Sequence, residues 1–328
     1  MMKKKLVCEH LLIECGFGQL IEEHISLVQL VYGIAYRACA LTAVQLYDAA
    51  CALFLGLVMF VFNIVTDAYS LSEHSIIRNS LLSKHQWFQQ LIQLPGMDTV
   101  TVCPLFIETV KCLVHCEIPV IDCPHTDRII VDRYAGICSS LLPHLYTLYQ
   151  WNRALKHAFP NTRARHDLQV PDCLLDIEHT IRAWTPKTPA GFLEQYSDTE
   201  IQMMVTHARA YRLAALLLIH RLRSPFGVED DTAQEYAGEI FWEIRCFLRS
   251  FPPGYSTSFP LVFPLLLASL GVQGPGEDIL SCLPYSVQAV CASKLQSFVR
   301  EVWRQRNNGF HGSWLELVDE YLNVAVLP

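Results

Sequence analysis

The sequence predicts an all-α protein, an irregular multi-helix bundle with fully buried central helices. Apolar side chains make up 52% of its 328 residues and charged side chains only 17%, so the chain has more material for a core than for a surface. Apolar residues recur with a helical period in several segments. The β-branched segments 99–102 and 129–131 are too short and too isolated to found a sheet.

Four segments show the helical period clearly: 141–159, 205–222, 239–251 and 287–302. In each of them one face is apolar, so each needs a partner to cover that face. The helix of 239–251 is predicted to begin near Thr232. Thr232 and Glu235 have the form of a capping box, and the adjacent Asp230 and Asp231 complement the positive end of a helix.

The segment 49–66 leaves two possibilities open. It contains no charged residue, and its length is at the lower limit for crossing a bilayer. Against a membrane span, Asn63 lies inside the segment, Asp48 and Asp67 bound it, and no basic residue flanks it closely. We expect a fully buried helix at the centre of the fold. A membrane-anchored helical protein that uses 49–65 is kept as an alternative.

Proline and glycine clusters separate helices of ordinary length, which predicts a single α-helical domain over 1–328. The one candidate seam lies near 185–198, where two prolines and a glycine occur. The first seven residues resemble the basic start of a signal peptide. Glu9, His10 and Glu14 interrupt the apolar stretch that should follow, so secretion is not expected.

The charge balance argues against a nucleic-acid partner. The net charge is −7, with 32 acidic and 25 basic side chains, and no basic stripe is present. The nearest candidate runs from Arg153 to His166 and is interpreted as a helix end and a loop. The 13 cysteines have no pairing rhythm, and Cys51, Cys138 and Cys246 lie in apolar runs. They are predicted to be buried thiols of a reducing compartment.

Common catalytic motifs are missing from the sequence. It contains no G-x-S-x-G, no phosphate-binding lysine loop and no H-E-x-x-H. His207 and His220 have no acid or nucleophile at helical spacing, so satisfied or exposed imidazoles are expected. We therefore predict no catalytic residue and no cofactor.

Two clusters leave metal binding open as an alternative. Asp230, Asp231 and Glu235 could hold magnesium as in a helical terpene-cyclase-like enzyme, but a second acidic cluster is lacking and the helix start explains them better. A second cluster has spacings that could supply four zinc ligands. Its cysteines are equally compatible with small apolar residues on a helix and a following loop. It consists of Cys112, His115, Cys116, Cys123 and His125.

Several motifs of the second half of the chain form a recognisable order. Trp184-x-Pro186 comes first, then an Ala-x-x-Tyr-Arg-x-Ala helix at 208–214, then Pro264-Leu-Leu, and finally tryptophan segments around Trp303 and Trp314. This order resembles the C-terminal regulatory half of fungal Zn2Cys6 (zinc binuclear cluster) transcription factors. The match runs from about 184 to 318, and 92–118 is compatible with it.

The resemblance implies that these motifs are core anchors. Trp303 and Trp314 are expected to bury their rings, and Tyr211 to bury its ring while its hydroxyl finds a partner. The six proposed anchors are Trp184, Tyr211, Arg212, Pro264, Trp303 and Trp314.

The resemblance also implies a function, which is transcriptional regulation in a fungal nucleus through protein partners or a small effector. The DNA-reading module of the family needs C-x-x-C runs, and none occurs in these 328 residues. Direct DNA binding by this chain is therefore not supported. Either the module lies upstream, or the chain is a regulatory domain that acts by itself.

Overall fold

The computed structural model describes residues 40–65, 71–123, 128–132, 134–158, 172–249, 261–274 and 289–322. These residues form twelve α-helices and one short 3-10 turn, which confirms the predicted all-α class. The helices are α3 (Ala40–Val65), α4 (Leu71–Ser83), α5 (His85–Leu91), α6 (Asp98–His115), α7 (Leu142–Ala158), α8 (Asp172–Ala183), α9 (Phe192–Gln195), α10 (Asp198–Arg223), α11 (Asp230–Arg249), α12 (Val262–Gly271), α14 (Ala289–Asn307) and α15 (Trp314–Tyr321).

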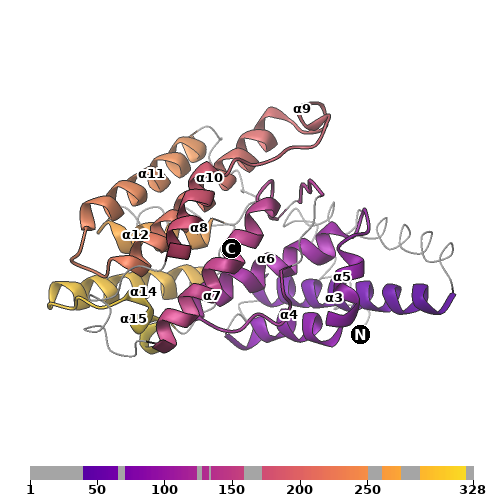
Figure 1. The fold of residues 1–328 in the computed structure, drawn as a ribbon, viewed down its shortest axis with the longest axis horizontal. Helices are drawn as coiled ribbons and strands as arrows, with labels where there is room; N and C mark the ends of the chain where they lie inside the picture. Colours follow the sequence, from indigo (N-terminus) through magenta and orange to yellow (C-terminus); the bar gives the residue numbers. More distant parts are fainter. Residues whose placement is uncertain are drawn as a thin grey trace.

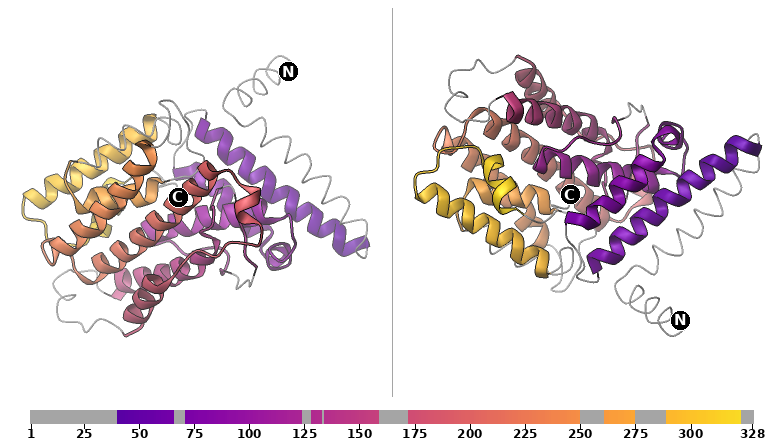
Figure 2. Two further views of the ribbon diagram at one scale, coloured as in Figure 1. Left: turned by 90° about the horizontal axis from the view of Figure 1, so that it is seen from above. Right: turned by 90° about the horizontal axis from the view of Figure 1, so that it is seen from below.

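The helices follow the chain from one end of the molecule to the other (Figure 1). Helices α3 to α6 lie at one end, α11 to α15 lie at the other, and α7, α8 and α10 lie between them. The last helix, α15, packs back against α6. Two further views show the long α3 along the outside of the molecule (Figure 2). One cluster of buried apolar residues runs from Ala49 of α3 to Leu322 after α15.

Helix α6 is one of the fully buried helices that the sequence predicts, since every side chain from 100 to 114 is buried. Its buried threonines, Thr101 and Thr109, donate their hydroxyls to the carbonyl oxygens of Met97 and Leu105, four residues earlier. Its buried carboxylate, Glu108, accepts a hydrogen bond of 2.9 Å from Arg78 of α4. The polar groups of this core helix are therefore largely paired, as burial requires.

Helix α12 is the second fully buried helix, with every residue from Val262 to Gly271 buried. It packs against α11 at Gly271. A Cβ atom at Gly271 would lie 2.8 Å from the Cβ of Ala237 and 3.1 Å from the carbonyl oxygen of Ala233. The glycine therefore permits an approach of two helices that any larger residue would prevent.

The segment 49–65 is expected from its sequence to form a fully buried helix at the centre of the fold. This expectation is wrong, because one face of the helix is exposed. Leu55, Val58 and Met59 of α3 are exposed, with exposed fractions of 59%, 42% and 43%. Only the opposite face is buried, at Ala49, Ala50, Leu53, Leu57 and Phe60. Only one face is buried because the helices that pack against α3, which are α4, α5 and α6, all lie on that side. Among the described residues, no helix is long and apolar enough to cross a membrane.

The start of α11 is confirmed at the predicted acidic stretch, but the predicted capping box is wrong. The helix begins at Asp230, two residues before Thr232, so Thr232 and Glu235 do not form a capping box. Capping boxes occur instead at two other helix starts, Ser197 with Glu200 and Ser313 with Glu316. The loop before α11 places the carboxylate of Asp230 against two guanidinium groups, one from Arg221 before the loop and one from Arg306, 76 positions later.

The other predicted helices are confirmed where they can be seen. Helices α7, α10, α11 and α14 account for nearly all of the described residues of the four periodic segments. Residues 99–102 lie in α6, and the segment 128–132 contributes only the isolated bridge between Asp132 and Gly136. Cys138 is buried and Cys51 is half-buried, whereas Cys246 is exposed on α11, contrary to the prediction. The signal-like start and most of the basic stretch after Arg153 lie outside the described residues.

Candidate functional site

A partly buried ionic cluster links the ends of three helices. Asp230, the first residue of α11, accepts hydrogen bonds from Arg221 of α10 at 2.6 Å and from Arg306 of α14 at 2.9 Å. The backbone N–H of Gly227 donates to the same carboxylate at 3.2 Å. The arginines are in the last turns of their helices, and Asp230 is in the first turn of α11. Each charge is therefore opposite in sign to the partial charge of its helix end, which is a favourable arrangement.

The two arginines share an aromatic ring as well as a carboxylate. The guanidinium carbon of Arg221 lies 5.3 Å from the ring centre of Phe226, and that of Arg306 lies 4.4 Å from it. Arg306 also lies 4.1 Å from the ring of Trp303. Burial lowers the pKa of both arginines, and the attraction of Asp230 opposes this shift. We call Arg221, Phe226, Asp230 and Arg306 the Asp230 cluster.

The same cluster holds the loop between α10 and α11. Arg221 donates to the carbonyl oxygens of Ser224, Pro225 and Val228 at 3.4 to 3.5 Å. The carbonyl oxygen of Glu229 lies 3.0 Å from Nε2 of His220, and the backbone of Glu229 has a φ of +48°, which is uncommon for a residue other than glycine. Burial lowers the pKa of His220, and Arg221 lowers it further.

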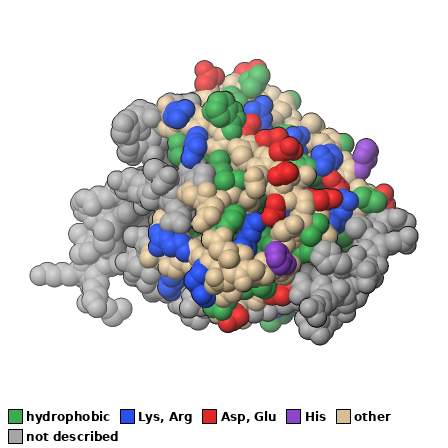
Figure 3. Space-filling view, turned by 90° about the vertical axis from the view of Figure 1, so that its left-hand side faces the viewer, with side chains coloured by type: hydrophobic (Ala, Val, Ile, Leu, Met, Phe, Trp, Pro, Cys, Tyr) green, Lys and Arg blue, Asp and Glu red, His purple; other side chains and the backbone are tan. Residues whose placement is uncertain are grey.

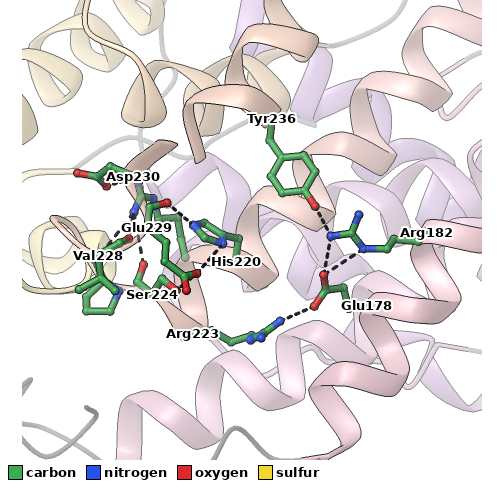
Figure 4. A network of polar contacts seen from close by, with 11 residues as sticks. Glu178, Arg182, His220, Arg223, Ser224, Val228, Glu229, Asp230 and Tyr236 are labelled. Carbon is green, nitrogen blue, oxygen red and sulfur yellow. Dashed lines mark hydrogen bonds and ion pairs between the residues drawn. The ribbon is translucent and has the colours of Figure 1, made fainter. Parts of the chain in front are cut away.

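A second, more exposed network lies beside the first (Figure 4). Glu178 of α8 accepts hydrogen bonds from Arg182 of the same helix and from Arg223 at the end of α10. Arg182 also donates to the hydroxyl of Tyr236 on α11. The network therefore ties α8 to both α10 and α11, although exposed ion pairs of this kind stabilise a fold only weakly.

Three of the six proposed anchors lie around the interior of α10. Trp184 is 9% exposed, and its indole N–H donates to the hydroxyl of Ser140 at 3.2 Å. Arg212 is half-buried and donates to the carbonyl oxygen of Trp184 at 3.5 Å. Tyr211 is completely buried, with its ring centre 5.0 Å from that of Phe106. Its hydroxyl has no hydrogen-bond partner among the described residues, contrary to the expectation.

The other three anchors lie on the last three helices. Pro264 is buried inside α12, and Trp314 is buried at the start of α15. Trp303 is only half-buried, and its indole N–H donates to the carbonyl oxygen of Ser269 in α12 at 2.8 Å. The ring of Trp303 thus links α14 to α12 and stacks on Arg306 of the Asp230 cluster.

His207 has a neighbour that its own helix does not supply. Its Nδ1 atom lies 3.2 Å from the sulfur of Cys138, which is 69 positions earlier in the chain. Both side chains are completely buried, and burial raises the pKa of Cys138. A buried, protonated thiol is a poor nucleophile, so the pair is interpreted as core packing rather than as a catalytic dyad.

The proposed metal clusters do not gather ligands in the described part of the chain. No group of three or more histidine, cysteine or acidic side chains is placed to hold a metal ion there. Burial raises the pKa of Cys123 to about 12 and raises that of Cys112 as well. Cys116 is buried at the end of α6, and His125 lies outside the described residues.

The acidic cluster at the start of α11 is likewise divided. Asp230 faces two guanidinium groups, whereas Asp231 and Glu235 are exposed to solvent. A magnesium site on a diphosphate would need these carboxylates to converge with others. The arrangement instead neutralises Asp230 inside the protein and gives no support to a terpene-cyclase-like enzyme.

Two hollows on the described surface are large enough for a small ligand or a side chain. One, of about 320 Å³, lies between α7 and the segment after α6, and we call it the tyrosine cleft. In this cleft the hydroxyl of Tyr146 donates a hydrogen bond of 2.7 Å to Asp122, and the ring centre of Tyr146 lies 6.0 Å from that of Tyr149. Its lining residues are Ile118, Pro119, Asp122, Tyr146, Tyr149, Gln150 and Arg153. The other hollow, of about 370 Å³, lies beside Trp242 on α11.

Charges of both signs are mixed on the surface that Figure 3 shows. Basic side chains lie among acidic ones on this face, and the described residues there form no continuous basic stripe. A mixed surface of this kind does not attract a polyanion strongly. This agrees with the net charge of −7.

A family model for the fungal specific transcription factor domain matches residues 68–326. The chain belongs to this family. It is therefore a fungal transcription regulator. The family match begins at residue 68, well before Trp184, which is the first residue of the sequence motifs that resemble the family. Comparison with curated proteins finds no match. Comparison with solved structures also finds none.

The sequence motifs of this fungal transcription factor domain do not single out Arg221, Arg306 or Phe226. Arg306 lies 76 positions from Asp230, and Arg221 lies nine positions from it across a loop, so no helical spacing links them. One signal was present: Arg221 interrupts the apolar run of α10, where a charge needs a partner if the helix is buried. That signal indicates an ion pair but not which carboxylate supplies it.

Proposed function

We propose that this regulator works in the nucleus as a regulatory domain that engages protein partners rather than DNA. The observation that carries the proposal is the family match over residues 68–326. The net charge of −7 and the lack of any C-x-x-C in the 328 residues support protein contacts over DNA contacts by this chain. The proposal assigns the domain no catalytic step.

A reporter assay with an artificially tethered protein tests the proposal. The full chain is fused to an unrelated DNA-binding domain and expressed in a fungal host that carries a reporter gene under the matching operator. We expect reporter output to differ from that of the DNA-binding domain alone, in either direction. Unchanged output, with the fusion present in the nucleus at normal level, would contradict the proposal.

The tyrosine cleft favours a small effector as a second mode of control. Four of its lining residues, Tyr146, Tyr149, Gln150 and Arg153, lie on one face of α7 at helical spacing. Its volume of about 320 Å³ is close to the lower limit of ligand sites, and it combines two aromatic rings with a guanidinium group. This chemistry suits a small aromatic acid, with the carboxylate on Arg153.

The effector proposal has its own test. NMR spectra of the full chain are recorded during titration with 4-hydroxybenzoate and, as a control, with 4-hydroxybenzyl alcohol, and the changes in chemical shift are followed. The acid is expected to shift the resonances of α7, and Arg153→Gln is expected to abolish the effect. Equal shifts with the acid and the alcohol, or no shift with either, would exclude a carboxylate site in the tyrosine cleft.

A further inference from the structure

Trp242 lies on the wrong face of α11 for an apolar residue. Its side chain is 67% exposed. The opposite face of the helix is buried at Ala233, Ala237, Ile240, Phe241, Ile244 and Phe247. An amphipathic helix normally carries polar residues on its outer face, and exposed tryptophans are typical anchors of protein interfaces. The packing of the domain itself does not account for this indole.

A hollow of about 370 Å³ lies beside the indole. It is lined by Leu213 of α10 and by Gly238, Glu239, Trp242 and Glu243 of α11. We call it the Trp242 groove. Helices α10 and α11 pack closely against each other, so the floor of the groove is held in place by the fold.

Gly238 gives the groove its depth. A Cβ atom at this position would have no heavy atom within 4 Å, so close packing does not require glycine there. Gly271 is the contrasting case, because a Cβ atom there would collide with α11. Glycine inside a helix is destabilising relative to alanine. An exposed helical glycine without a packing role, one turn before an exposed tryptophan, is explained if it keeps space open for a ligand.

The charges of the groove select the kind of ligand. Glu239 and Glu243 are two of its five lining residues. Arg209 lies 3.5 Å from Glu243 and is itself more than half exposed, so it neutralises this carboxylate only in part. An indole face attracts a cation within about 6 Å, and the carboxylates add to that attraction. The same carboxylates repel phosphates, which argues against a nucleic acid.

We propose that the Trp242 groove binds a segment of a partner protein that places an arginine or lysine side chain over Trp242 and between Glu239 and Glu243. An apolar neighbour of that residue packs over Leu213, which is buried beneath the groove. The inference rests on the proposed function, in which the domain acts through protein partners, and it names the chemistry of one such partner.

Peptide binding to the full chain tests the inference. The probe is a fluorescein-labelled peptide of alternating leucine and arginine, followed by fluorescence anisotropy. The control peptide has glutamate in place of arginine. We expect the arginine peptide to bind more tightly than the control and more weakly as salt is added. Trp242→Ala is expected to weaken binding about tenfold or more. The double variant Glu239→Gln with Glu243→Gln is expected to weaken it several-fold.

Two further variants separate the groove from general effects. Leu193→Ala with Glu194→Gln removes an exposed leucine and an exposed carboxylate of α9, and binding should not change. Gly238→Ala puts a methyl group into the groove. We expect it to raise the melting temperature and to weaken peptide binding, whereas a misfolded variant would have a lower melting temperature as well as weaker binding.

The outcomes distinguish this inference from the proposed function. Equal affinity for the arginine and glutamate peptides, or unchanged affinity in the Trp242→Ala protein, overturns the Trp242 groove as a binding site. If the tethered reporter still responds in that case, the proposed function stands without it. If the reporter does not respond, the proposed function fails whatever the peptide does.

Discussion

The carboxylate of Asp230 lies 2.9 Å from the guanidinium group of Arg306, 76 positions later in the chain. Arg221 approaches the same carboxylate from α10 at 2.6 Å. One acidic residue thus fixes the positions of α10, α11 and α14 at the point where the three helices meet. A buried ion pair adds little to the net free energy of unfolding, but removal of one partner leaves the remaining charges buried and unpaired, which is costly.

Asp230→Ala is expected to destabilise the protein by about 3 kcal/mol. The substitution leaves the guanidinium groups of Arg221 and Arg306 in a largely buried position without their carboxylate. Urea denaturation followed by circular dichroism measures the change. Asp231→Ala is the matched control, because that neighbouring carboxylate is exposed, and it should change stability by less than about 0.5 kcal/mol. Equal effects of the two variants would show that the Asp230 cluster does not hold the helices.

Two alanine substitutions for glycine are expected to have opposite signs. Gly271→Ala forces a methyl group against Ala237 and should destabilise the protein by about 1–3 kcal/mol. Gly238→Ala meets open space on a helix and should stabilise it by about 0.5–1 kcal/mol. Thermal unfolding of both variants beside the wild type gives the signs directly. Destabilisation by Gly238→Ala would mean that its surroundings are tighter than the structure shows.

Trp303→Ala is expected to cost about 2–4 kcal/mol, below the cost for a fully buried tryptophan, because the ring is half-buried. Trp303→Phe keeps an aromatic ring for Arg306 but removes the hydrogen bond to the carbonyl oxygen of Ser269, so it should cost about 1 kcal/mol. Denaturant titrations measure both. If phenylalanine and alanine are equally destabilising, the stacking on Arg306 contributes nothing.

Stability should fall as the pH drops through the ordinary pKa of histidine. Burial and Arg221 lower the pKa of His220 below 6.5, so the unfolded chain takes up a proton that the folded imidazole does not. The stability from neutral His220 is therefore complete above about pH 6.5 and is lost as the pH falls toward the lowered folded value. His220 sits beside Arg221 and near Glu229, whose side chain is 66% exposed.

The His220→Gln variant separates this residue from other titrating groups. Urea unfolding at about pH 7.5 and about pH 5.5 should show a smaller loss of stability in the variant than in the wild type. His144 keeps part of the dependence in both proteins, because burial lowers its pKa too. An identical loss in both proteins would mean that His220 is not a titrating contributor.

Helical periodicity predicted α7, α10, α11 and α14 because burial of one face imposes that period on the sequence. The uncharged apolar run of 49–66 misled the prediction for α3, since hydrophobicity shows that a helix avoids water but not whether one face or all faces do. Leu55 and Met59 are as apolar as Leu53, yet only Leu53 is covered. The difference comes from which side α4 and α6 occupy, and the sequence of α3 does not record that.

The Asp230 cluster was not predictable for a related reason. The acidic residues at 230 and 231 are equivalent in the sequence, and both fit the start of a helix. Only the fold turns one carboxylate toward Arg221 and Arg306 and leaves the other in solvent. The motif order from Trp184 to Trp314 carried the family resemblance, because aromatic and proline positions are tied to packing that a family shares.

Acute depletion of the protein in its native fungal host tests the central claim, that the chain is a transcription regulator. A degradation tag is added to the chromosomal gene, and newly made transcripts are measured shortly after depletion begins. A defined set of genes should change transcription promptly, before growth changes, and recover when the wild-type chain is restored. Depletion to completion with no prompt change in any transcript would contradict the claim.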